Sequence, residues 1–276
     1  MIDYSGRNVW ITGGASGIGL AVGKRLAGLG ACITVFDLRV REDVLTELDG
    51  ARRGAAVPAC GFVMDVTDSE QVRRIFQLAA KNNGAPDLVL NSAGIISAVP
   101  FGKLGYDEWD RVLRVNLYGS RNVASASQGL IRPGGRLAFV ASLAGIAGGY
   151  GYGAYAASKF GVVGLAEVLR VEWKPQDIAV SVICPPEVET PMVEAERRIR
   201  PAATAEMKLF AGTLTVDEAA ADIVAGLVRG RYMIVPGVRG RLTYLLAKFL
   251  PRFLVHAVAD RLVARALGKG GQNRAV

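Results

Sequence analysis

Residues 8–19 read Asn8-Val9-Trp10-Ile11-Thr12-Gly13-Gly14-Ala15-Ser16-Gly17-Ile18-Gly19. The first five of them predict a short buried strand, and the apolar-periodic residues after the glycines predict a helix. A glycine turn between a strand and a helix start lets backbone N–H groups approach a pyrophosphate, whose charge the helix dipole favours. This stretch therefore predicts a dinucleotide-binding turn, with Gly13, Ser16, Gly17, Ile18 and Gly19 at the cofactor.

Cofactor choice depends on the end of the next apolar run. Residues 32–36 lead into Asp37, eighteen residues after Gly19. A carboxylate at this point can accept hydrogen bonds from an adenosine ribose and would repel a 2′-phosphate. We therefore expect NAD, although Arg39 could receive that phosphate, and NADP remains the alternative.

Short apolar runs alternate with helical patterns along the chain. This alternation predicts a single-domain Rossmann-type fold, in which a doubly wound parallel α/β sheet carries a C-terminal helical extension. We expect a catalytic domain over residues 1–236 and the extension over residues 237–276. Further strands are expected at 87–91, 136–141 and 179–184, and helices at 69–81, 107–128 and 154–173.

A tyrosine and a lysine stand four residues apart, as Tyr155 and Lys159, thirteen residues after Ser142. On a helix this spacing places both side chains on one face. A tyrosine with the ordinary pKa of about 10 exchanges protons poorly at neutral pH. A nearby ammonium would lower that pKa, so Lys159 is expected to activate Tyr155 while Ser142 holds a substrate oxygen.

Together these motifs resemble the short-chain dehydrogenase/reductase family, from about Ser5 to Pro236. Residues 12–19 are similar to its cofactor loop, and residues 91–94 to its Asn-Asn-Ala-Gly strand end, with Ser92 for the second Asn. Residues 185–190 resemble its nicotinamide-contacting segment, with Pro186 in place of a glycine. The resemblance adds these expected cofactor contacts: Asp65, Val66, Asn91, Ala93, Gly94, Tyr155, Lys159, Pro185, Val188 and Thr190.

The resemblance also implies a catalytic tetrad of Asn116, Ser142, Tyr155 and Lys159. Tyr155 would exchange the proton while hydride passes between a secondary alcohol and the nicotinamide. Lys159 would also bind the nicotinamide ribose, and Asn116 would hold a water that links Lys159 to solvent. A Ser-His-Asp triad or a metal site is disfavoured, because His256 is the only histidine and the cysteines lack metal-ligand spacing.

The substrate is expected to be lipophilic. Residues 191–212 are the expected lid, and Met192 and Val193 join Ser142 and Tyr155 as expected substrate contacts. Our first hypothesis is a bulky hydroxysteroid that is oxidised with NAD. Residues 184–191 also resemble a segment of 3-ketodihydrosphingosine reductases, so reduction of a long-chain keto-lipid is the alternative. That resemblance is partial, because those enzymes use NADPH and usually lack a counterpart of Asp37.

The formal charge of +8 lies in the tail. From Arg229 onward ten Lys or Arg accompany one acid, Asp260, so this part carries +9 and the rest −1. Large aliphatic residues separate these cations, which argues against nucleic-acid binding. Three scattered cysteines indicate a reducing compartment, and the early first strand leaves no room for a signal peptide, so we expect a cytoplasmic protein.

Two helices are expected in the tail, at 242–250 and 253–267, separated by Pro251. Neither is long enough to span a bilayer. The second has an apolar stripe of Val255, Val258, Leu262 and Ala266. This stripe could lie on an anionic membrane, or it could pack on protein and cap the substrate cleft.

Two further expectations concern the oligomeric state and the class of function. Members of the family commonly pair through the helix that carries the tyrosine, so a homodimer or homotetramer is expected. A different class of function is a non-catalytic dinucleotide-sensing or scaffolding module with a membrane-binding tail. The complete tetrad argues against that module, because binding alone does not need Lys159 beside Tyr155.

Overall fold

Within residues 1–54 and 57–272, which this computed structural model describes, seven parallel strands form the central sheet. Their order is β3-β2-β1-β4-β5-β6-β9, so the direction of winding reverses between β1 and β4. Ligands bind at such a reversal, beyond the carboxyl ends of the strands. The strands are β1 Asn8–Thr12, β2 Cys32–Asp37, β3 Cys60–Val63, β4 Leu88–Asn91, β5 Arg136–Val140, β6 Ala179–Ile183 and β9 Met233–Ile234.

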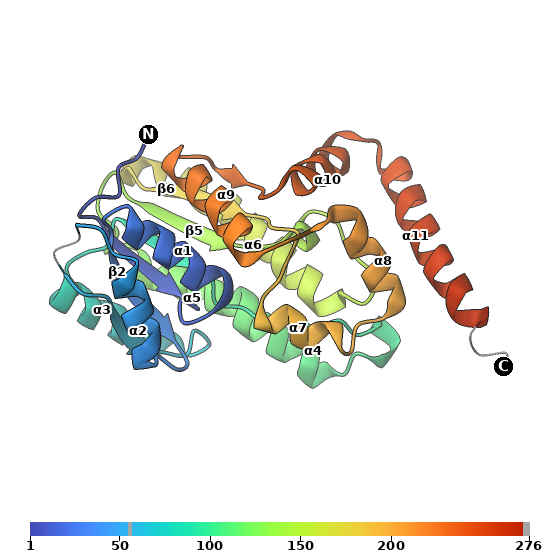
Figure 1. Ribbon diagram of the computed structural model, residues 1–276, viewed down its shortest axis with the longest axis horizontal. Coiled ribbons are helices and arrows are strands. Elements are labelled where there is room, and N and C mark those ends of the chain that lie inside the picture. Colours follow the sequence, from blue (N-terminus) through green and yellow to red (C-terminus); the bar gives the residue numbers. More distant parts are fainter. Residues whose placement is uncertain (55–56, 273–276) are drawn as a thin grey trace.

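Helices cover both faces of this sheet (Figure 1). One layer consists of α1 Gly17–Gly28, α2 Glu42–Gly50 and α9 Val216–Val228. The other consists of α3 Ser69–Asn83, α4 Tyr106–Leu113, α5 Gly119–Ser127 and α6 Gly153–Glu172. The predicted Rossmann-type architecture is therefore confirmed.

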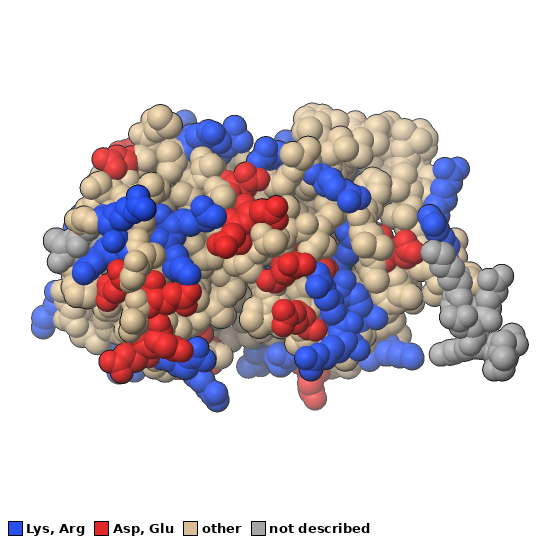
Figure 2. All heavy atoms as spheres, in the orientation of Figure 1, with Lys and Arg blue, Asp and Glu red and all other residues tan. Residues whose placement is uncertain are grey.

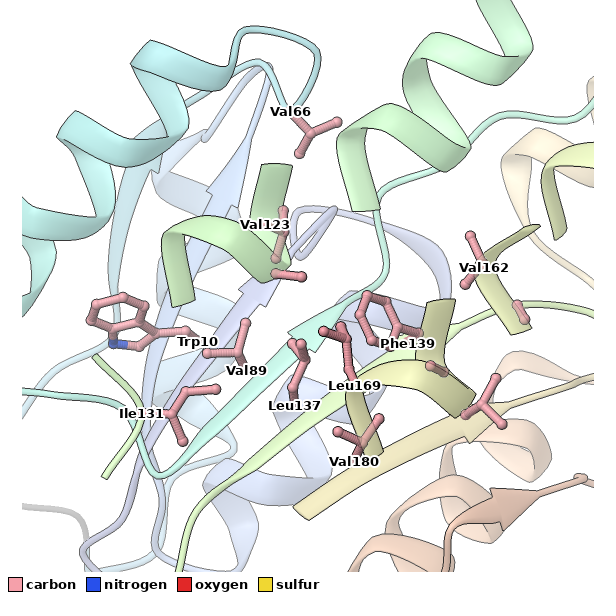
Figure 3. Close-up of a cluster of buried hydrophobic side chains, with 14 of the residues drawn as sticks. Trp10, Val66, Val89, Val123, Ile131, Leu137, Phe139, Val162, Leu169 and Val180 are labelled. Carbon is pink, nitrogen blue, oxygen red and sulfur yellow. The ribbon is translucent and has the colours of Figure 1, made fainter. Parts of the chain in front are cut away.

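Strand β1 shows why the sheet needs both layers. Val9 and Ile11 belong to the core under α1 and α9, whereas Trp10 belongs to the opposite core. All three are fully buried, as expected for a parallel strand covered on both faces. The Trp10 ring meets Phe76 of α3 at 5.1 Å between ring centroids. Figure 3 shows the same core continuing along the sheet to Phe139.

The predicted helix at 107–128 is interrupted. A π-helical turn, Arg114–Tyr118, separates α4 from α5. Such turns widen a helix by one residue and often occur at functional sites. Here the turn carries Asn116. Hydrophobic periodicity does not reveal a single extra residue, so the sequence predicted one continuous helix.

Apart from α9 and β9, the chain after β6 builds a separate wall beyond the sheet (Figure 1). It contains the two-stranded pair β7 Glu187–Val188 and β8 Thr213–Leu214, and the helices α7 Pro191–Arg197, α8 Ala202–Ala211, α10 Val238–Phe249 and α11 Arg252–Gln272. Helix α11 lies along α8, although the two are far apart in sequence. None of the described helices combines the length and hydropathy that a bilayer crossing requires.

Candidate active site

One cavity of about 830 Å³ extends from the glycine turn, past Tyr155, to α10 and α11. Most residues that the sequence assigned to cofactor, chemistry or substrate line it. These are Gly13, Ser16, Gly17, Ile18, Asp37, Asp65, Val66, Ala93, Gly94, Ser142, Tyr155, Lys159, Pro185, Val188, Thr190, Met192 and Val193. Three others, Gly19, Asn91 and Asn116, do not line the cavity.

The glycine turn is shaped by close backbone contacts. Gly13 has φ +63°, and a Cβ there would lie 2.7 Å from the backbone of Ala93. A Cβ on Gly19 would lie 2.2 Å from the carbonyl oxygen of Gly13. Gly19 therefore allows α1 to begin directly under the turn, which leaves the backbone at Gly13 and Gly17 on the cavity wall.

Asp37, the last residue of β2, is held beside this turn. One carboxylate oxygen accepts a hydrogen bond from the Ala15 N–H at 3.0 Å. The other accepts one from the Leu38 N–H at 2.8 Å. The carboxylate thus lies at the cavity edge next to the pyrophosphate turn, where a ribose would be held. Arg39 is exposed and does not line the cavity.

Asn91 was predicted to contact the cofactor, but the structure gives it a supporting place. Its side chain accepts a hydrogen bond from Thr12 at 2.7 Å and donates one to Ser120 at 2.7 Å. It therefore ties β1 and β4 to α5 behind the wall. The amide oxygen and the amide nitrogen are each bonded to another side chain, and Asn91 does not line the cavity.

Asn116 lies on the π-helical turn, and its side chain joins the segment after β4 to helix α6. Its Oδ1 accepts from the Ile95 N–H at 2.8 Å, and its Nδ2 donates to the Ile95 carbonyl at 2.9 Å and to Ser158 Oγ at 3.0 Å. A Cβ on Gly94 would lie 3.1 Å from Asn116 Oδ1 and 3.4 Å from Lys159 Nζ. The absent side chain at Gly94 thus keeps open the space between the asparagine and the lysine.

Ser142, Tyr155 and Lys159 meet where α6 passes the end of β5. Ser142 forms a side-chain hydrogen bond with Tyr155. Lys159 Nζ lies 5.7 Å from the centroid of the Tyr155 ring and donates to the Val140 carbonyl at 2.9 Å. Tyr155 and Lys159 share one helix face, and both are buried. The three groups could bind and protonate one oxygen atom.

Burial, rather than the lysine, dominates the acidity of the tyrosine. Desolvation raises the pKa of Tyr155 to about 12, and the hydrogen bond with Ser142 opposes this only in part. Desolvation also lowers the pKa of Lys159 to about 8. Lys159 does not lower the tyrosine pKa as expected, because with a pKa of about 8 it has lost its charge before Tyr155 ionises. At neutral pH the Tyr155 hydroxyl keeps its proton.

A glycine sets the approach of Ser142 to α6. The short 3₁₀ helix Leu143–Gly145 follows Ser142 and packs on α6. A Cβ on Gly145 would lie 2.6 Å from the carbonyl oxygen of Lys159. Any larger residue would push this segment, and Ser142 with it, away from the helix.

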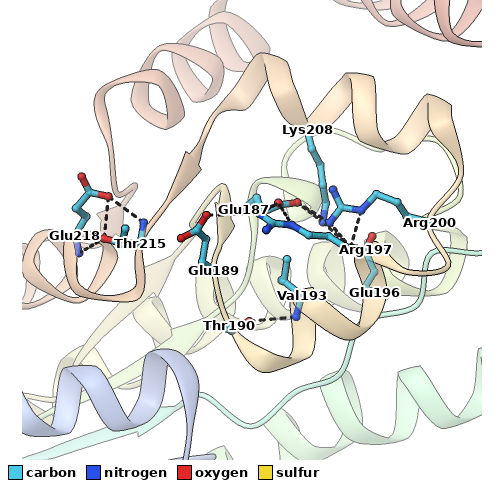
Figure 4. Close-up of polar contacts among 10 residues, drawn as sticks. All are labelled: Glu187, Glu189, Thr190, Val193, Glu196, Arg197, Arg200, Lys208, Thr215 and Glu218. Atoms are coloured by element: carbon cyan, nitrogen blue, oxygen red, sulfur yellow. Dashed lines mark hydrogen bonds and ion pairs between the residues drawn. The ribbon is translucent and has the colours of Figure 1, made fainter.

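A buried cluster of charges, absent from the sequence predictions, anchors the lid (Figure 4). Glu187 of β7 pairs with Arg197, with Arg200 at 2.8 Å and with Lys208 at 2.8 Å. Glu196 also pairs with Arg200, and with Lys208 at 3.1 Å. Both carboxylates are nearly inaccessible to solvent. The cluster joins β7, α7 and α8.

The same cluster reaches the catalytic helix through Tyr152. The Tyr152 hydroxyl donates to Glu196 at 2.9 Å, and its ring lies 5.4 Å from the Tyr155 ring. Thr204 of α8 adds a hydrogen bond to the Tyr150 carbonyl at 2.8 Å. The lid is therefore fixed directly to the segment that leads into Tyr155.

The tail forms the far end of the cavity. Val255, Val258 and Leu262 of α11 line it, and Ala266 is buried. Of the two interpretations left open by the sequence, the stripe on α11 therefore packs on protein and caps the cleft. Helix α10 contributes Thr243, Tyr244, Leu246 and Ala247 to the same wall, and Leu250 directly after it also lines the wall, which sequence patterns did not indicate.

A family model described as short chain dehydrogenase matches residues 7–200. The chain belongs to the short-chain dehydrogenase/reductase family. It is 31% identical over 238 residues to a 3-dehydrosphinganine reductase of Danio rerio, which covers 84% of this chain and 71% of that protein. It is 33% identical to a putative ketoacyl reductase of granaticin polyketide synthase from Streptomyces violaceoruber, over 86% of this chain and 85% of that one.

Solved structures of the family agree with this fold. Levodione reductase superposes with a TM-score of 0.75 at 29% identity, over 87% of this chain and 98% of that chain. A Burkholderia phymatum member in complex with NAD superposes at 0.72 with 25% identity, over 85% and 90% of the two chains. The protein is thus an oxidoreductase of this family that acts on a CH–OH group or its ketone.

The Glu187 cluster gives a stability prediction. Burial raises the pKa of Glu187, but the hydrogen bonds from Lys208 and Arg197 outweigh it and lower the pKa to about 2. The stabilisation by ionised Glu187 is therefore fully present above the pKa of a glutamate in the unfolded chain, about 4.3. It is lost as the pH falls toward 2. Glu187→Gln should destabilise by about 3 kcal/mol at pH 7, because it leaves buried cations unpaired.

Urea unfolding of the native protein and of the Glu187→Gln variant, measured between pH 7 and pH 3, checks this prediction. The difference between the two proteins in free energy of unfolding should become smaller below about pH 4. Asp43→Asn, which breaks an exposed pair with Arg41, serves as the control and should leave the midpoint almost unchanged. A constant difference across this pH range would contradict the assignment.

Proposed function

We propose that this protein reduces the ketone of a long-chain lipid to a secondary alcohol, with NADH as the hydride donor. The observation that carries the proposal is the shared cavity, in which Ser142 and Tyr155 lie between the glycine turn and a long apolar wall. A hydride and a proton must reach one carbonyl group. The cavity supports this reaction, because the Tyr155 hydroxyl and the glycine turn that would hold the hydride donor both line it.

Each residue of the site has its own part in the proposed reduction. The nicotinamide, when bound, supplies a hydride to the carbonyl carbon. Ser142 donates a hydrogen bond to the carbonyl oxygen and stabilises its developing negative charge. The Tyr155 hydroxyl gives that oxygen a proton. Lys159, fixed by the Val140 carbonyl, holds positive charge behind the phenol as it becomes a phenolate.

The protonated tyrosine can act directly as the acid that reduction needs. Reduction requires Tyr155 as an acid, and its pKa of about 12 keeps the proton available. Oxidation of an alcohol would require the phenolate, which burial disfavours. The preference for reduction over our first hypothesis, the oxidation of a hydroxysteroid, comes from the similarity to 3-dehydrosphinganine and ketoacyl reductases.

The wall beyond Tyr155 supports a chain-like substrate. It is built by the lid and by both tail helices, and its apolar residues include Met192, Val193, Met207, Phe210, Leu246, Leu250, Val255 and Leu262. A run of aliphatic and methionine side chains suits a flexible acyl chain. The similarity to 3-dehydrosphinganine and ketoacyl reductases favours the keto-lipid over the steroid.

NADH is the favoured donor because of Asp37. Its carboxylate lies beside the turn, where a 2′-phosphate would meet a negative charge. The exposed Arg39 has no contact with the cavity. The solved relative in complex with NAD is consistent with this choice.

Reduction of 3-keto acyl chains of increasing length, followed by loss of NADH absorbance, tests the proposed substrate. We expect kcat/KM to rise roughly fourfold per added methylene until the wall is filled. Tyr155→Phe should lower kcat by about a hundredfold or more while NADH affinity stays the same. The exposed Tyr118 gives the control Tyr118→Phe, which should be fully active. Rapid turnover of a hydroxysteroid panel without turnover of the keto chains would refute the proposal.

A second set of variants tests the cofactor. Asp37→Ala removes the charge that opposes a 2′-phosphate, so the NADPH-to-NADH ratio of kcat/KM should rise by about tenfold or more. Arg39→Ala is the matched control and should leave the ratio of the native protein unchanged. A fall in NADPH use on Arg39→Ala would show instead that this guanidinium binds the phosphate.

A further inference from the structure

Helix α10 exposes a regular apolar stripe. Val238, Leu242, Leu245 and Phe249 follow one another at intervals of four, three and four residues, which places them on one helix face. Val238 is 79% exposed and Phe249 is 71% exposed. Soluble domains seldom leave such a continuous row of large apolar side chains in water.

The stripe continues around the turn between the tail helices. Pro251 ends α10, and Phe253 and Leu254 at the start of α11 are also exposed. We call Val238, Leu242, Leu245, Phe249, Phe253 and Leu254 the apolar elbow. Figure 2 shows an uncharged surface over α10 and the start of α11, with Lys and Arg along its lower border.

The elbow differs from the stripe that the sequence offered as a membrane contact. That stripe, on α11, is used against the cavity. The opposite face of α10 is used in the same way, since Leu246 and Ala247 line the cavity. The elbow is therefore the outer side of the helices that close the lipid end of the site.

Positive charge surrounds the elbow. Residues 238–259 contain four Lys or Arg and no acid. Lys248 Nζ lies 5.6 Å from the Phe249 ring, and Arg252 is exposed. Arg241 is partly neutralised by Asp222 at 2.8 Å, and Arg239 donates to the Leu209 carbonyl at 2.9 Å. The partner that fits is apolar at its centre and negative at its edge.

These features select a lipid surface over a second copy of the chain. In a symmetric dimer this patch would face itself, and the positive charges around it would repel. An anionic bilayer attracts the cations by about 1 kcal/mol each near the surface and accepts the aromatic side chains at its interface.

We propose that the apolar elbow docks this protein on anionic membranes. Phe249 and Phe253 enter the headgroup boundary, while Lys248 and Arg252 contact lipid phosphates. This orientation brings α10 and α11, which close the apolar end of the cavity, against the bilayer. The docking itself does not depend on which ketone is reduced.

Flotation of the full chain with vesicles tests the proposal. Vesicles of phosphatidylcholine with added phosphatidylserine should bind at least tenfold more protein than phosphatidylcholine alone. The triple variant Leu245→Ser, Phe249→Ser and Phe253→Ser should lose at least about tenfold of that binding. None of the three residues lines the cavity, so reduction of a short soluble ketone should be unchanged.

A matched control uses exposed apolar residues far from the tail, one directly after α1, one on β3 and one on α3. The triple variant Leu29→Ser, Val63→Ser and Leu78→Ser should bind vesicles as the native protein does. Equal loss in both triple variants would overturn the proposal, as would equal binding to neutral and anionic vesicles. The proposal would also be overturned if the native protein did not bind vesicles and the elbow substitutions converted an oligomer into a monomer. The elbow would then be a subunit contact.

Discussion

The close approach of the segment after β5 to helix α6 is the constraint on which the site depends. Gly145 lets this segment rest against the Lys159 carbonyl, and Ser142 is thereby held within hydrogen-bonding reach of Tyr155. Tyr155 is buried at this contact, whereas Ser142 is partly buried. Burial raises the pKa of Tyr155 to about 12, so its hydroxyl keeps its proton at neutral pH and can donate it to an oxygen that Ser142 also binds.

Sequence reasoning predicted those parts that depend on local pattern. The glycine turn, the alternation of strands and helices, and the Tyr155–Lys159 spacing are short motifs with direct physical meaning, and each defined its element correctly. The family and its fold are confirmed. Spacing alone could not show that Asn91 and Gly19 lie behind the cavity wall, because that depends on contacts with distant segments.

Long-range contacts account for what the sequence did not reveal. Glu187 reads as one acid in a proline-rich loop, yet it binds cations from two helices that follow it. The exposed and buried faces of α10 both contain leucines, so hydropathy could not say which face closes the cavity. The acidity of Tyr155 was mispredicted for a similar reason, since burial of the pair outweighs the charge of its neighbour.

Gly145→Ala tests most directly whether this contact governs catalysis. The added Cβ would lie 2.6 Å from a backbone oxygen, so Ser142 must move while the glycine turn stays intact. We predict that kcat/KM for ketone reduction falls about a hundredfold and that NADH affinity persists. Gly164→Ala, on α6 and with open space around the added Cβ, should keep full activity. Full activity in folded Gly145→Ala would contradict the account.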